Sequence, residues 1–149
     1  MKLKNSASFL SVLAISSSTV LFSGTAFAAP KLQTQRNVLY SCTIPSQSRV
    51  MKFIEIATMD VSREDRPVEL DKTYELWIDG VLVTKGQFHM DYAAGDGKMY
   101  EVYESKAPRG SRTWIEAAPL EGEAKVTYPG KDDQMRDTYI QRTFYYCNQ

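Results

Sequence analysis

The sequence predicts an all-β protein, a small antiparallel β-barrel of about eight strands arranged as a meander. Three observations support this prediction. Short runs of β-type residues alternate with turn sequences, and no convincing helix interrupts them. Two cysteines lie near the two ends of the patterned region, and an Asp-Gly pair joins two of the strand-like runs. A β-sandwich is the alternative architecture.

The first 28 residues have the pattern of a secretory signal peptide. Lys2 and Lys4 give a positive start, an apolar run follows, and Ala26-Phe27-Ala28 has the small-x-small form of a cleavage site. We therefore expect cleavage near Ala28 and a protein of the periplasm or the extracellular space. No later apolar run is long enough for a spanning helix, so we expect no integral membrane span after signal removal.

The rest of the chain has the length of one domain. Residues 29–36 are polar and show no pattern, so we expect a flexible lead-in. Residues 37–149 are expected to form a single β domain.

The charge of the exported part argues against nucleic acid as a partner. Without Lys2 and Lys4 the chain carries 16 basic and 18 acidic residues, a net charge of −2. A protein with this balance has no general attraction to polyanions. One histidine and two cysteines are also too few for a zinc finger or an iron–sulfur cluster.

Cys42 and Cys147 are the only cysteines in the chain. In an oxidising compartment we expect them to form a disulfide bond. The Cα atoms of bridged cysteines lie within about 7 Å of each other, so the first and last strands should be side by side. This favours closure of the sheet into a barrel over an open sandwich.

Eight strand-like runs are expected, over 38–44, 49–59, 74–78, 81–84, 99–104, 112–117, 124–128 and 139–147. The run over 49–59 is unusual because both its faces are apolar, with Val50, Ile54 and Ile56 on one face and Met51, Phe53 and Met59 on the other. A strand with one face in water would not show this pattern. Part of this strand is therefore expected to bend or to be covered on both sides.

Asp79-Gly80 predicts a two-residue β-hairpin. Asp-Gly readily adopts the positive φ angles of a type I′ turn. The turn places three pairs of residues opposite each other, namely Ile78 and Val81, Trp77 and Leu82, and Leu76 and Val83.

Catalytic and metal-binding constellations are weak in this sequence. His89 and Asp91 could serve as base and orienting group for Ser105 or Ser111, but no nucleophile motif surrounds either serine. Acidic residues occur in several turns without the spacing of a calcium loop. We therefore expect no enzyme activity, no metal site and no cofactor.

Aromatic and basic residues gather between positions 92 and 114. Tyrosine, tryptophan and arginine are enriched where proteins recognise one another. The candidate binding residues are Tyr92, Lys98, Tyr100, Tyr103, Arg109, Arg112 and Trp114.

The tripeptide Tyr40-Ser41-Cys42, at the start of a small exported β domain, resembles the periplasmic lysozyme inhibitors. That resemblance implies a small disulfide-bridged barrel that plugs an enzyme cleft with a loop. The Ser- and Lys-bearing inhibitory loop has no clear match here, Lys98 being the nearest candidate. The Gly-x-Trp signature of lipocalins is also missing, so we assign no family.

These observations together predict a non-enzymatic binding protein that recognises another macromolecule, in its most specific form an inhibitor or an immunity protein. The partner is expected to be a protein of the envelope or outside the cell. One alternative is a β-barrel that binds a small ligand in its interior. Another is a structural or virulence-associated subunit that assembles through an exposed strand edge.

Overall fold

The structure is a computed structural model that describes residues 29–63, 65–106 and 111–149. The expected signal peptide (1–28) and the candidate binding residue Arg109 lie outside the described residues. Within the described part, no helix has the length and apolar character needed to cross a membrane.

The described chain forms nine antiparallel strands and one short 3-10 turn, so the predicted count of about eight strands is too low. The strands are β1 (Leu32–Ile44), β2 (Arg49–Asp60), β3 (Val68–Ile78), β4 (Val81–Gly86), β5 (Phe88–Gly95), β6 (Lys98–Ser105), β7 (Trp114–Ala118), β8 (Glu123–Lys131) and β9 (Asp137–Asn148). The 3-10 turn covers Pro45–Gln47, between β1 and β2.

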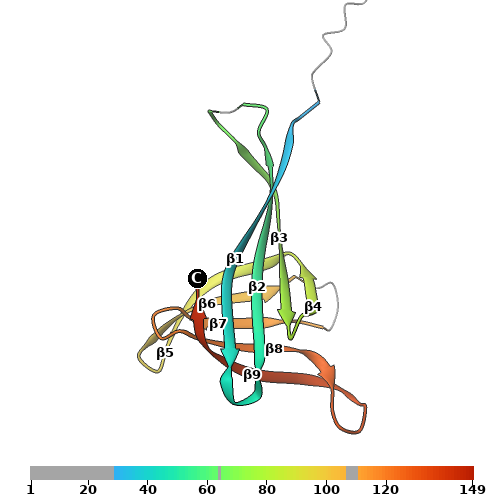
Figure 1. Ribbon diagram of the computed structural model, residues 1–149, viewed down its shortest axis with the longest axis vertical. Coiled ribbons are helices and arrows are strands. Elements are labelled where there is room, and N and C mark those ends of the chain that lie inside the picture. The colour runs from blue at the N-terminus through green and yellow to red at the C-terminus, as the bar shows by residue number, and fades with distance from the viewer. Residues whose placement is uncertain (1–28, 64, 107–110) are drawn as a thin grey trace, which may run out of the picture.

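All nine strands belong to one sheet, in the order β4-β3-β2-β1-β9-β8-β7-β6-β5. The sheet curls into a half-barrel, in which β1 to β3 run upright and β6 to β9 cross them (Figure 1). The strands follow one another as a meander, as predicted. β4 and β5 are consecutive in the chain but form the two edges of the sheet.

A disulfide bond links the first strand to the last. Cys42 and Cys147 are 105 residues apart in sequence, and their Cα atoms are 4.0 Å apart. β1 pairs with β9 at the same place. The predicted bridge and the predicted adjacency of the terminal strands are therefore confirmed. The bond is compatible with an oxidising compartment outside the cytoplasm.

The hairpin at Asp79-Gly80 also forms as predicted. Both residues have positive φ, 53° and 78°, as a type I′ turn requires. Ile78 lies opposite Val81 and Trp77 opposite Leu82, but the register then shifts. A bulge places Thr84 rather than Val83 opposite Leu76, and Val83 packs against the core instead.

The core lies on the concave side of the sheet and is rich in aromatic rings. Phe53 of β2 is at its centre, with ring centroids 5.4 Å from Tyr74, 5.4 Å from Phe88 and 5.0 Å from Tyr103. Since Phe88 and Tyr103 come from β5 and β6, these contacts join the two halves of the curled sheet. Buried aromatic rings contribute both their large apolar area and their edge-to-face contacts to stability.

The first three strands are longer than the sequence indicated. β1 begins at Leu32, because residues 32–36 pair with residues 56–60 of β2. The expected flexible lead-in is therefore strand from Leu32 onward. The outer parts of β1, β2 and β3 project from the body as a twisted three-stranded ribbon (Figure 1).

The strand missing from the prediction is β5. It pairs only with β6, and Phe88 is its only buried residue. An edge strand whose side chains are nearly all in solvent lacks the alternation of buried and exposed positions that reveals a strand in sequence.

Candidate functional site

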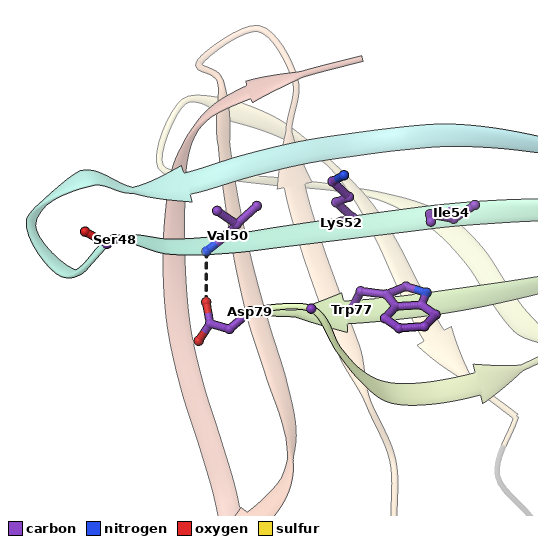
Figure 2. Close-up of a pocket in the computed structure, with 7 residues that line it drawn as sticks. Ser48, Val50, Lys52, Ile54, Trp77 and Asp79 are labelled. Atoms are coloured by element: carbon purple, nitrogen blue, oxygen red, sulfur yellow. Dashed lines mark hydrogen bonds between the residues drawn. The ribbon is translucent and has the colours of Figure 1, made fainter.

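A groove lies on the convex face of β2 and β3, beside the Asp79-Gly80 turn. Its volume is about 650 Å³, and it is lined by Ser48, Val50, Lys52, Ile54, Trp77, Asp79 and Gly80. Figure 2 shows Val50, Lys52 and Ile54 along β2, with Trp77 on the neighbouring β3.

The alternation of side chains along a strand explains why these residues face outward. Met51 and Phe53 are fully buried on the concave side, so the residues between and beside them point to the convex side. Lys52 lies opposite Trp77, which in turn lies opposite Leu82 of β4.

Apolar side chains lie around Trp77 in and beside the groove. Val50 is 38% exposed and Leu82 41%, while Ile54 and Trp77 are half-buried. Val50 and Ile54, two of the outward apolar residues of β2 that were unusual in the sequence, therefore belong to this surface. An apolar patch surrounded by polar residues is typical of an interaction site.

The indole ring of Trp77 is held in place by a buried carboxylate. Its Nε1 donates a hydrogen bond to Oε2 of Glu75, at 3.0 Å. Glu75 is only 4% exposed and also accepts from Arg36 at 2.7 Å and from Lys85 at 3.0 Å. Three donors from three different strands thus fix one carboxylate, and through it the position of the indole.

These contacts keep Glu75 ionised. Burial alone would raise the pKa of the Glu75 carboxyl group. Hydrogen bonds from Lys85, Trp77 and Arg36 outweigh burial and lower this pKa to about 2. The carboxylate therefore remains charged, and able to hold the indole, throughout the neutral and mildly acidic range.

A second carboxylate shapes the end of the groove at the hairpin turn. Oδ1 of Asp79 accepts from the backbone N–H of Val50 at 3.0 Å (Figure 2), and Oδ2 pairs with Arg49 at 2.7 Å. Lys52 has no ion-pair partner within the part of the chain that the structure describes. The groove is therefore bordered by more positive than negative charge.

The predicted binding residues that the structure describes do not form one surface. Tyr103 is buried in the core, while Tyr92 is 61% exposed on β5. Tyr100 is half-buried on β6, and Lys98 pairs with Glu123 at 3.0 Å.

Arg112 and Trp114, two members of this set, share a neighbourhood around Tyr139. The backbone N–H of Arg112 donates to the hydroxyl group of Tyr139 at 3.3 Å, and the Trp114 ring lies 5.5 Å from the Tyr139 ring. Arg112 also forms an ion pair with Glu104 at 2.8 Å, so its charge already has a partner within the protein.

His89 and Ser105, one of the two serines considered as its partner, lie on opposite faces of the sheet. His89 lies opposite Glu104, whereas Ser105 lies opposite Phe88 on the core side. Oγ of Ser105 accepts from the backbone N–H of Thr113 at 2.8 Å, which gives this serine a structural role. Among the described residues, no three His, Cys, Asp or Glu side chains are grouped as metal ligands.

Comparison of the chain with protein-family models, with curated proteins and with solved structures finds no match in any of the three. Function is therefore inferred from the geometry of the described residues. The residues that sequence reasoning missed are those of the Trp77 groove. The apolar residues on both faces of β2 were the signal that could have revealed it.

Proposed function

We propose that this protein is an exported, non-enzymatic binding protein that recognises another protein through the Trp77 groove. One observation carries the proposal: a tryptophan lies at the centre of an exposed apolar groove, and a buried carboxylate fixes its indole. An inhibitor or an immunity protein is the most specific form of this function.

Tryptophan is among the residues that contribute most to protein–protein binding energy. An anchor that is already fixed in the free protein loses little conformational entropy on docking. The hydrogen bonds from Trp77, Arg36 and Lys85 to Glu75 supply that rigidity. The disulfide between Cys42 and Cys147 supports the same scaffold.

The charges around the groove indicate the chemistry of the partner. Four cationic side chains, Arg36, Arg49, Lys52 and Lys85, lie in or beside it. They face two carboxylates, one of which is buried. A partner with an apolar side chain flanked by Asp or Glu would complement both the groove and its border.

The packing of the core makes the convex groove, rather than the interior of the curled sheet, the larger recognition surface. Large side chains occupy the concave side, among them Tyr40, Phe53, Leu76, Ile115 and Phe144, all at most 1% exposed. The groove on the convex face, at about 650 Å³, is about twice the size of the hollow that Tyr40 lines on the concave side, at about 330 Å³.

The test is a comparison of two tryptophan variants. A partner captured from an envelope extract and identified by mass spectrometry is titrated against the wild-type protein, Trp77→Ala and Trp114→Ala. Trp77→Ala should weaken binding by about 30-fold, the loss expected for an anchor residue worth about 2 kcal/mol. Trp114→Ala should bind like the wild type.

Thermal denaturation of both variants shows whether the fold is kept. A Trp77→Ala variant that is folded and binds with wild-type affinity would contradict the proposal. Equal losses in both variants would contradict it as well.

A further inference from the structure

A second hollow lies on the concave side of the sheet, between β1 and β6. Its volume is about 330 Å³, and it is lined by Val38, Leu39, Tyr40, Glu101, Tyr103 and Gln149. It shares no residue with the Trp77 groove, so a ligand site in this hollow is independent of the proposed function.

Glu101 is the only acidic side chain among the described lining residues. Its Oε2 accepts hydrogen bonds from the hydroxyl groups of Tyr40 and Tyr103, the latter at 3.0 Å. Both tyrosines are buried, at 1% and 6% exposure, so neither donor can turn away to solvent. The carboxylate is therefore held in one orientation by groups of the core.

The negative charge of Glu101 has no cationic partner among the described residues. No Lys or Arg nitrogen of the described chain is within ion-pair distance of it, and no described group donates to its Oε1. Phenol groups stabilise a carboxylate but leave its charge uncompensated. Since a half-buried charge is costly without a counter-charge, the site favours a cation from outside.

Aromatic rings surround this carboxylate. The rings of Tyr40 and Tyr103 meet edge to face, with centroids 6.3 Å apart. On the neighbouring strand Tyr92 lies directly opposite Glu101 and is 61% exposed. Residues opposite each other in an antiparallel pair have Cβ atoms about 5 Å apart, so Tyr92 lies next to Glu101, outside the six residues that line the hollow.

The tyrosines remain neutral donors. Burial, together with the hydrogen bond to Glu101, raises the pKa of Tyr40 to about 12. Burial and the nearby Tyr40 and Glu101 groups also raise the pKa of Tyr103. At neutral pH the two hydroxyl groups therefore keep their protons and donate to Glu101.

We propose that this hollow binds a primary ammonium group carried on an alkyl stem. The ammonium donates to Oε1 of Glu101, as charge-assisted hydrogen bonds favour. Val38 and Leu39 offer apolar surface to the stem, and Tyr92 lies next to Glu101 on the neighbouring strand. Aromatic faces also attract cations directly. Two sources have this chemistry, a lysine side chain of a protein and a free alkyl diamine.

The test is an NMR titration of the full folded protein with four probes: pentylamine, 1,5-diaminopentane, Nα-acetyl-lysine methylamide and uncharged pentanol. Binding is followed by the amide shifts of residues 38–40, 101 and 149. The three amines should shift these amides in a saturable way, and pentanol should not. Tighter binding of the lysine derivative indicates a protein source, and tighter binding of the diamine indicates a free amine.

Two isosteric variants separate charge from shape. Glu101→Gln keeps the size of the side chain and should weaken amine binding at least about tenfold. Glu116→Gln, which changes a surface carboxylate paired with Lys125, should bind as the wild type does. Should Glu101→Gln fail to fold, Tyr92→Ala removes only an exposed ring and should weaken binding several-fold.

Two results would overturn the proposal. One is the absence of saturable shifts at these amides with any amine at high concentration. The other is equal affinity for the amines in the wild type and in a folded Glu101→Gln or Tyr92→Ala variant.

Discussion

Replacing Glu75 with Gln should destabilise the protein in a way that depends on pH. Gln keeps the shape of the side chain but loses the charge that attracts Arg36 and Lys85. The folded-state pKa of Glu75 is about 2, below its ordinary value of 4.5. The carboxylate therefore stabilises the fold fully above the unfolded-state pKa, and this contribution is lost as the pH falls toward 2.

The size of the effect follows from the lowered pKa. Each pKa unit corresponds to about 1.4 kcal/mol, so the full shift would correspond to roughly 3 kcal/mol. The side chains of Arg36 and Lys85 are 53% and 55% exposed, so solvent screens part of this interaction. We expect Glu75→Gln to lower the free energy of unfolding by about 2 kcal/mol at pH 7.

Urea denaturation of the wild type and Glu75→Gln at pH 7, 5, 3 and 2 measures this difference. It should be constant between pH 7 and 5 and should shrink toward zero near pH 2, where the wild-type carboxyl group becomes protonated. A difference that does not change with pH would refute the ionic account of Glu75. So would a variant that is as stable as the wild type at pH 7.

Two further predictions concern the scaffold. Cys42→Ala combined with Cys147→Ala removes the bridge across 105 residues, and the resulting loss in the free energy of unfolding should be at most about 4–5 kcal/mol. Urea denaturation of the oxidised, reduced and doubly substituted protein measures this loss. A loss below about 1 kcal/mol would mean that the bridge contributes little to the fold. Ser105→Ala leaves the buried N–H of Thr113 without its acceptor and should cost about 1–3 kcal/mol in thermal denaturation, whereas exposed Ser111→Ala should cost less than about 0.5 kcal/mol. Equal effects of the two serine substitutions would contradict the role assigned to Ser105.

Local chemistry made part of the fold predictable. The Asp79-Gly80 turn depends on residues that accept positive φ, and this preference is visible in sequence. The adjacency of β1 and β9 followed from the two cysteines. The early start of β1 was hidden, because residues 32–36 become a strand only through pairing with β2. β5 was hidden because an edge strand with one buried residue carries almost no periodic signal.

The candidate site was less predictable than the fold. Tyr103 could be recognised as an aromatic residue in a strand, but which face of that strand is buried depends on how the sheet curls. The partners of Glu75 come from β1, β3 and β4, and no local pattern brings Arg36 and Lys85 together around it. The apolar residues on both faces of β2 were visible, yet burial and binding both explain such a pattern.

The most direct test of the central claim is site-specific photo-crosslinking in cells that produce the protein. A photoreactive residue in place of Leu82 lies in the exposed apolar surface beside Trp77, and one in place of Thr127 lies on β8, away from the groove. The proposal predicts a discrete crosslinked protein from position 82 that disappears with Trp77→Ala and does not form from position 127. A crosslink that persists in the folded Trp77→Ala variant, or that forms equally from both positions, would contradict recognition through the Trp77 groove.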